Sequence, residues 1–250
     1  MRYFIFLSYR GTNFHGWQRQ PASMSVQQLL EETLAIKLGE AVTVTGAGRT
    51  DAGVHAMRYC AHFDTLRDDL AGNNDFIRSL NGLLPSDVAV EEIRRVQPDA
   101  SARYSAISRT YIYRIVRRKN PFHTETGWFM PVSADVDQMN MACKILMEYT
   151  DFASFQKSNS SAKTTTCRIM EAGWSQTDDF LEFRITADRF LRNMVRAITG
   201  TMIDVGRGKI SPGQFRDIVE ARDRTRSGQS APAKGLFLAA INYPSEIFTD

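Results

Sequence analysis

Apolar and polar positions alternate with different periods along the chain, which predicts a mixture of strands and helices. Residues 2–10 alternate aromatic and aliphatic side chains in the manner of a strand. Residues 25–39 instead bring apolar side chains to one face at helical spacing, and Ser25 followed by Gln28 has the form of a capping box. Further strands are predicted at 54–64, 88–96, 102–117, 166–176, 180–187 and 235–243, and further helices at 74–83, 136–149, 189–205 and from Ser211 onward.

The predicted strands follow one another in hairpin-like runs and do not alternate strictly with helices. This order is typical of an α+β protein with mainly antiparallel sheet. We therefore expect two mixed, mainly antiparallel sheet lobes with helices packed on one side. Because no linker rich in Pro, Gly or Ser interrupts the chain, we expect a continuous sheet to join an N-terminal lobe at 1–103 to a C-terminal lobe at 104–250.

Composition narrows the class of protein. The chain has 250 residues, of which 43% are hydrophobic and 24% charged, and these values exclude a disordered or fibrous protein. No apolar run approaches the roughly 18 residues of a membrane span. The N-terminus becomes polar too quickly for a signal peptide, and three widely spaced cysteines provide no disulfide framework. These features predict a cytoplasmic protein.

Positive charge is concentrated in one stretch, although the formal net charge of the chain is only +3. Residues 94–119 contain eight basic residues and a single acidic one, with three tyrosines interleaved. Such a pattern suits a polyanion with bases that can stack. It equally suits a solvated edge strand that arginines protect against aggregation. The stretch alone leaves both interpretations open.

A glycine-rich loop carries the most distinctive chemistry. Residues 46–56 read GAGRTDAGVHA, which matches neither the GxGxxG fingerprint nor a Walker phosphate loop. Its glycines allow tight turns that could present Asp51 rigidly to a ligand, with Arg49 two residues before it. Asp51 could then act as a nucleophile that an arginine keeps ionised. The alternative is an aspartate that bonds to the backbone of its own turn.

A metal site is not expected. His55 and His62 are seven residues apart on a predicted strand and so face opposite sides, while Cys60 with His62 gives two ligands at most. Arg196, next to apolar Met194 and Val195, is expected to be partly buried and to need an anionic partner. Asp51 is a candidate partner, with Asp188 and Asp204 as structural alternatives.

Several motifs together resemble one known family. The sequence GRTDAGVH at 48–55 is similar to the signature of the tRNA pseudouridine synthases of the TruA type. Further similar elements follow the family's order: YRGTNFHGWQRQ at 9–20, ARYSA at 102–106, RTYIY at 109–113, DFASF at 151–155, MVR at 194–196 and GLFL at 235–238. The chain departs from the family pattern at Ser101, where His is common, and at Arg58-Tyr59, where Gly-Gln is common.

The resemblance implies an enzyme that isomerises uridine to pseudouridine at positions 38, 39 and 40 in the anticodon stem-loop of tRNA. It implies no cofactor and no metal. Family members are homodimers with a basic cleft between two α+β lobes, and their partner is tRNA, not DNA or a membrane.

The resemblance also implies roles for individual residues. Asp51 corresponds to the nucleophile and Arg196 to the arginine that pairs with it. Tyr111 corresponds to the tyrosine that stacks on the target uracil, and Arg49 to the arginine that holds the flipped-out nucleotide. The expected tRNA-contacting residues are Arg103, Tyr104, Asn159 and Lys163.

Two other classes of protein share part of this pattern. An RNA-binding protein with a degenerate, non-catalytic site would keep the basic stretch, but it would not need Asp51, Tyr111 and Arg196 together. A phosphate-ester enzyme would need a metal cluster or a lysine on the glycine loop, and the sequence has neither.

Overall fold

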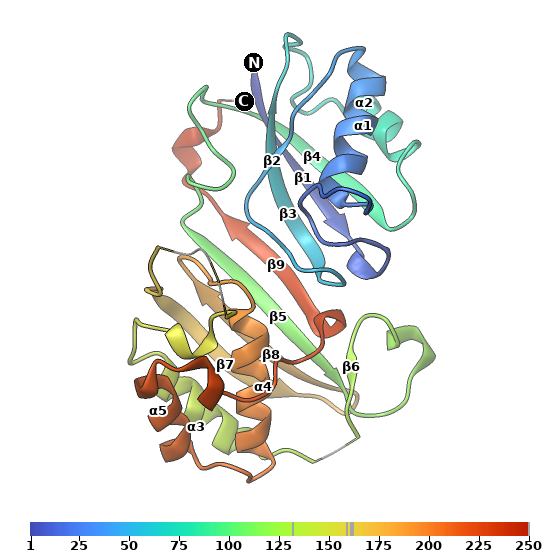
Figure 1. Cartoon of the computed structure of the whole chain (residues 1–250). Coiled ribbons are helices and arrows are strands. Elements are labelled where there is room, and N and C mark those ends of the chain that lie inside the picture. Colours follow the sequence, from blue (N-terminus) through green and yellow to red (C-terminus); the bar gives the residue numbers. More distant parts are fainter. Residues whose placement is uncertain (132, 159, 161–162, 250) are drawn as a thin grey trace. The chain divides into compact units, whose positions relative to one another are not determined.

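The computed structural model describes residues 1–131, 133–158, 160 and 163–249 and divides the chain into two compact units. Unit 1 consists of Met1–Ile107 with Leu238–Asp250, and unit 2 of Ser108–Phe237. The described residues form nine strands and five α-helices, so the α+β prediction is confirmed (Figure 1). No helix in this part of the chain is long and apolar enough to cross a membrane.

The two units differ from the expected lobes in two places, the boundary near residue 103 and the C-terminal segment. The first boundary lies four residues beyond 103, and residues 238–250 group with unit 1 and not with the C-terminal lobe. Long-range backbone bonds explain this grouping. The amide of Gln97 donates to the carbonyl of Ile247 at 2.8 Å, and that of Thr249 to Arg95 at 3.1 Å.

Unit 1 contains an antiparallel sheet in which β1 lies between β4 and β3. The strands are β1 (Arg2–Tyr9), β3 (His55–Asp64) and β4 (Val88–Val96), with the short β2 (Thr45–Gly46) paired to β3. The helices are α1 (Val26–Leu38) and α2 (Asn74–Asn81), and α2 packs on β4. The centre of β1 is buried on both faces, because Tyr243 and Phe248 cover Phe4, with ring centroids 5.0 and 6.1 Å away.

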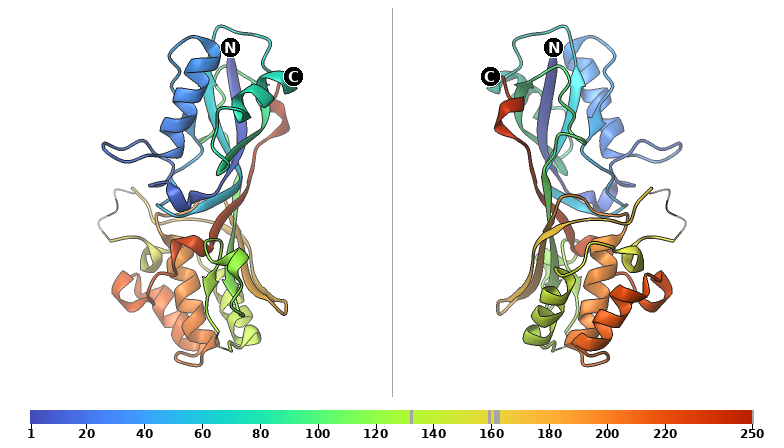
Figure 2. Two further views of the ribbon diagram at one scale, coloured as in Figure 1. Left: turned by 90° about the vertical axis from the view of Figure 1, so that its right-hand side faces the viewer. Right: turned by 90° about the vertical axis from the view of Figure 1, so that its left-hand side faces the viewer.

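Unit 2 also contains an antiparallel sheet, in which β8 lies between β5 and β7. The strands are β5 (Ser108–Val116), β7 (Ile169–Gln176) and β8 (Phe180–Ala187), and β6 (Trp128–Phe129) pairs with β5 in parallel. Three helices pack against one another beside this sheet: α3 (Val136–Leu146), α4 (Met194–Gly206) and α5 (Pro212–Ala221) (Figure 2). The last strand, β9 (Leu236–Asn242), runs across the boundary between the units.

Short 3-10 helices complete the described secondary structure. They span Gly11–Asn13, Pro121–His123, Ala153–Phe155, Arg224–Arg226, Ala233–Gly235 and Ser245–Ile247.

Local hydrogen bonds change the predicted start of two elements. The strand expected at 102–117 begins at Ser108, because residues 101–105 form a turn in which Ser101 and Ser105 bond to each other. The helix expected at 189–205 begins at Met194, since Asn193 adopts a left-handed conformation with φ of 67°. Arg192 therefore precedes the helix that carries Arg196.

The helix caps follow the predicted chemistry in part. The Ser25 hydroxyl accepts the Gln28 amide at 3.2 Å, but the Gln28 side chain bonds to Glu32 and not back to Ser25. Half of the predicted capping box is therefore present at α1. A complete capping box begins α5, where Ser211 and Gln214 bond to each other in both directions.

Gly200 on α4 lies against the backbone of the segment that leads to β9. A Cβ atom there would lie 1.8 Å from the carbonyl oxygen of Gln229, so Gly200→Ala must push two backbone segments apart. We expect this substitution to lower the free energy of unfolding by about 1–3 kcal/mol, measured by urea denaturation.

Gly213→Ala is the matched control for Gly200→Ala. Gly213 lies in α5, where an added Cβ would make only an ordinary contact at 3.6 Å. Alanine is the better helix former by up to about 1 kcal/mol, so this variant should be neutral or more stable. An equal loss of stability in both variants would contradict the packing argument.

Candidate active site

The glycine loop, residues 46–53, is enclosed by the amino-terminal segment, residues 9–20. The Tyr9 hydroxyl lies 2.9 Å from the hydroxyl of Thr50, and the Trp17 amide donates to the Thr50 carbonyl at 3.4 Å. The amide of Gly53 donates to the Phe14 carbonyl at 3.4 Å. Two motifs that are far apart in the sequence thus form one structural element around Asp51.

Gly16 makes the closest approach to the peptide between Thr50 and Asp51. Its φ of +87° lies in the left-handed region, which favours glycine. A Cβ at this position would lie 2.3 Å from the Thr50 carbonyl oxygen and 3.3 Å from the carbonyl carbon of Asp51. Position 16 therefore needs a glycine, both for its positive φ and because a Cβ would clash with the Thr50 carbonyl oxygen. The close contact fixes the backbone at Asp51.

Three buried aromatic residues support the glycine loop from the core of unit 1. The ring of Tyr59 stacks on Trp17 with centroids 4.1 Å apart, and Tyr9 lies 5.7 Å from Tyr59. The Tyr59 hydroxyl accepts the Gly48 amide at 3.3 Å and donates to the Gly48 carbonyl. The sequence presented Tyr59 only as a departure from the family pattern, and the structure shows that it contacts the loop.

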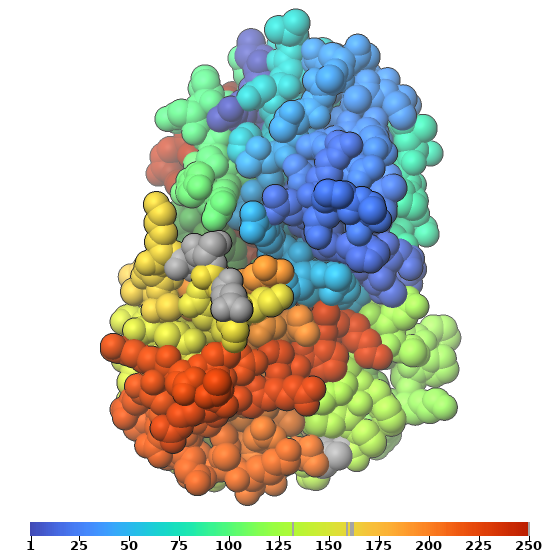
Figure 3. Space-filling view, in the orientation of Figure 1, coloured from blue at the N-terminus to red at the C-terminus, as the bar shows by residue number. Residues whose placement is uncertain are grey.

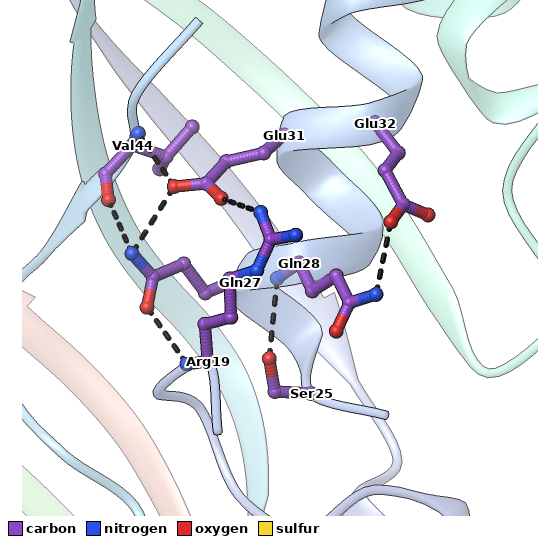
Figure 4. Close-up of polar contacts among 7 residues, drawn as sticks. All are labelled: Arg19, Ser25, Gln27, Gln28, Glu31, Glu32 and Val44. Carbon is purple, nitrogen blue, oxygen red and sulfur yellow. Dashed lines mark hydrogen bonds and ion pairs between the residues drawn. The ribbon is translucent and has the colours of Figure 1, made fainter. Parts of the chain in front are cut away.

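Helix α1 holds the chain on both sides of this element (Figure 4). The Gln27 amide group donates to the Val44 carbonyl at 2.9 Å, and Glu31 accepts the Val44 amide at 3.1 Å, just before the glycine loop. Gln27 also accepts the backbone amide of Arg19 at 2.9 Å. Residues 18–22, which follow the buried Trp17, are exposed on the surface of unit 1 (Figure 3).

The two charged residues of the glycine loop differ in exposure. Asp51 is half-buried and Arg49 is exposed, while Thr50 between them is buried. The carbonyl of Asp51 accepts the Val54 amide at 3.1 Å, which closes the turn before β3. Thr50 is therefore packed against the core of unit 1, while the Arg49 side chain faces the solvent.

In unit 2, strand β5 carries two tyrosines on one face. The ring of Tyr111 packs edge-on against Phe190 with centroids 5.1 Å apart. Tyr113, two residues further and so on the same face, is buried and donates to the Pro232 carbonyl at 2.7 Å. Burial raises the pKa of Tyr113 above its ordinary range, and the positive charge of Arg196 opposes this shift. Arg196 thus lies near the tyrosine-bearing face of β5.

Arg196 is half-buried on α4, as the sequence predicted. Its Nε donates to the Ala231 carbonyl at 2.7 Å, and the Ala231 amide returns a bond to the Arg196 carbonyl at 3.0 Å. Both structural alternatives for its anionic partner contact other groups. Asp188 accepts the amides of Arg168 and Arg189, and Asp204 pairs with Lys209 at 2.8 Å.

Arg103 and Tyr104 lie exposed on the turn at 101–105 of unit 1. The guanidinium carbon of Arg103 is 5.2 Å from the centre of the Tyr104 ring, which is 80% exposed. His62 accepts the Ala102 amide at 3.2 Å through Nδ1 and so anchors this turn. Burial lowers the pKa of His62, and nearby Arg2 lowers it further, which favours the neutral form that can accept this bond.

The predicted site residues are thus divided between the two units. Unit 1 holds Arg49 and Asp51 on the glycine loop and Arg103 and Tyr104 on the exposed turn, while unit 2 holds Tyr111, Lys163 and Arg196. Lys163 is exposed, and Asn159 lies outside the described residues. Across the ranges that the structure describes, no group of three or more His, Cys, Asp or Glu side chains could hold a metal ion.

Comparison with known proteins identifies the family. The model of a family described as tRNA pseudouridine synthase matches residues 5–105 and 142–244. The chain is 50% identical over 248 residues to a protein of Parabacteroides distasonis, covering 99% of this chain and 98% of that one. It is 48% identical over 250 residues to a protein of Porphyromonas gingivalis, covering 99% of each.

A more distant relative gives the same result. A protein of Acetivibrio thermocellus is 37% identical over 241 residues, covering 96% of this chain and 98% of that one. All three relatives carry the name tRNA pseudouridine synthase A. The chain therefore belongs to the tRNA pseudouridine synthases, a family of isomerases.

The Gly16 contact gives a direct test of the loop geometry. Gly16→Ala should displace the Thr50–Asp51 peptide. Because Asp51 is the candidate reacting group and small misplacements of such groups are costly, we expect kcat for pseudouridine formation to fall by about 10- to 100-fold. The affinity for tRNA should change little, since phosphate contacts dominate it. Steady-state kinetics on a tRNA transcript, with binding measured separately, give both values.

Gly39→Ala is the control for conformational strain. Gly39 caps α1 with a φ of +71°, but a Cβ there would contact nothing within 4 Å. This variant should lose stability through strain alone and keep its kcat. If both variants lose the same fraction of kcat, displacement of Asp51 is not the cause.

Proposed function

We propose that this enzyme converts uridine to pseudouridine at positions 38, 39 and 40 in the anticodon stem-loop of tRNA, with Asp51 as the nucleophile. The observation that supports this role for Asp51 is the close contact of Gly16 with the Thr50–Asp51 peptide. A protein that only binds RNA has no need for a half-buried carboxylate on so tightly held a loop. Family membership supports tRNA as the substrate.

The reaction suits a carboxylate and needs no redox step. The N1–C1′ glycosidic bond of uridine breaks, the uracil turns, and a C5–C1′ bond forms. C5 loses a proton and N1 gains one, so atoms and electrons balance. Asp51 would form the covalent intermediate that divides this exchange into two steps. By the family resemblance, Arg196 would be the arginine that pairs with the nucleophile.

The other site residues would bind and unstack the target nucleotide. Extruding a paired uridine costs a few kcal/mol. Stacking of the uracil on Tyr111 and entry of Arg49 into the vacated space would offset that cost. Arg103, Tyr104, Asn159 and Lys163 would contact the RNA outside the reacting base. By the family resemblance, the enzyme would act as a homodimer, without cofactor or metal. The sequence features described above predict that it acts in the cytoplasm.

The role of Asp51 can be tested by removing its charge. Asp51→Asn should abolish pseudouridine formation on an unmodified tRNA transcript while leaving tRNA affinity within a few-fold, because phosphate contacts dominate binding. Chemical mapping of pseudouridine reports the extent and the position of the reaction. Asp75→Asn, at a carboxylate that is 88% exposed on α2, is the control and should react normally.

The two parts of this proposal fail separately. Substantial turnover by Asp51→Asn would rule out Asp51 as the nucleophile. Pseudouridine that the wild-type enzyme forms outside positions 38–40 would overturn the proposed positions without affecting the role of Asp51.

The proposed RNA contacts predict a change in salt dependence. Arg103→Glu or Lys163→Glu should weaken tRNA binding and flatten the plot of log affinity against log salt by about one unit for each phosphate that the variant no longer neutralises. Arg78→Glu on α2, where the side chain is 78% exposed, is the control and should keep the wild-type slope. If neither test variant changes the slope, both residues lie outside the RNA interface.

A further inference from the structure

The residues on either side of Arg49 are each held by a tyrosine hydroxyl. The Tyr59 hydroxyl accepts the Gly48 amide and donates to the Gly48 carbonyl, so it contacts both polar groups of that residue. The Tyr9 hydroxyl lies 2.9 Å from the hydroxyl of Thr50. Arg49 thus lies between two anchored residues while its own side chain is exposed.

The space on the side-chain side of Gly48 is open. A Cβ added there would find no atom within 4 Å, apart from its chain neighbours. At Gly46, by contrast, a Cβ would lie 2.3 Å from both Trp17 Nε1 and the Tyr59 hydroxyl. The loop is therefore tightly packed at its first residue, Gly46, and has open space at Gly48. The hydrogen bonds from Tyr59 supply at Gly48 the restraint that packing supplies at Gly46.

Tyr59 is itself held rigidly. It is fully buried, it pairs with Leu7 of β1, and its ring stacks on Trp17 at an interplanar angle of 27°. A hydroxyl on such a ring has little freedom to move, so the position of Gly48 is tied to the core of unit 1.

We propose that Tyr59 is a positioning residue for Arg49. Its hydroxyl fixes the backbone from which Arg49 extends, so that the guanidinium starts close to the geometry it needs when the target uridine leaves the helix. This inference rests on the proposed function of Arg49. Without the hydroxyl, Arg49 would extend from a looser backbone and would stabilise the flipped-out state less.

The test compares two buried tyrosines of unit 1. Tyr59→Phe keeps the ring on Trp17 and removes only the hydroxyl. Tyr3→Phe is the control, because Tyr3 is also fully buried, stacks on Phe63, and donates its hydroxyl to a backbone carbonyl, that of Arg67, at 3.1 Å. Both variants should lose similar thermal stability. Tyr59→Phe should lower the single-turnover rate on folded tRNA by about tenfold with KM nearly unchanged, and Tyr3→Phe should keep the wild-type rate.

A double-mutant cycle then shows whether Tyr59 acts through Arg49. In the Arg49→Ala background, Tyr59→Phe should slow the reaction much less than it does in the wild type, because the group that it positions is gone. The defect of Tyr59→Phe should also shrink on a tRNA whose target uridine is unpaired. Should Tyr59→Phe fold poorly, Tyr9→Phe tests the anchor at Thr50 in the same cycle and should show the same pattern.

Three results would overturn the inference: a wild-type rate for Tyr59→Phe, an equal slowing in both backgrounds, or a wild-type rate for Arg49→Ala alone. Failure of the proposed function looks different. It appears as substantial turnover by Asp51→Asn, whatever the rate of Tyr59→Phe.

Discussion

The contact between Gly16 and the Thr50–Asp51 peptide sets the geometry of the candidate site. It is possible only because Gly16 lacks a Cβ and adopts a positive φ. The same segment is tied to the start of α1, where the amide of Val26 donates to the Gly16 carbonyl at 3.3 Å and that of Gln27 to Trp17 at 3.0 Å. A displacement of the loop would therefore disturb the first turn of α1 as well, so the packing of that helix stabilises the position of Asp51.

The sequence predicted the parts of the fold that depend on local pattern. The period of apolar positions located β1 and α1 within a residue or two, and the glycine-rich loop singled out Asp51. The parts that it missed depend on long-range contacts. The burial of both faces of β1 comes from the far C-terminal segment, and the two-residue β6 is too short to leave a pattern. The support that Tyr59 gives to Gly48 also needed the structure, because the pairing of β2 with β3 brings the loop alongside that residue.

Each unit holds a different set of the proposed site residues. Unit 1 fixes the backbone of Asp51 through packing, while unit 2 places Tyr111 and Tyr113 on one face of β5, with Arg196 near Tyr113. In unit 2, Arg196 is held in place by hydrogen bonds between α4 and the segment before β9, including the two bonds between Arg196 and Ala231. Groups held in this way need little rearrangement on binding, which is the condition that preorganised electrostatic catalysis requires.

The contacts that support the glycine loop differ in kind from those expected to bind tRNA. The contacts that hold the backbone of the loop itself come from neutral groups: tyrosine hydroxyls, an indole ring and backbone amides. The charged Glu31 bonds to Val44, just before the loop. Salt screens charges but leaves contacts between neutral groups almost unchanged. The phosphate contacts of tRNA, in contrast, weaken steeply as salt rises. The neutral contacts that hold the loop backbone therefore change little with ionic strength, which acts mainly on the phosphate contacts that bring the tRNA.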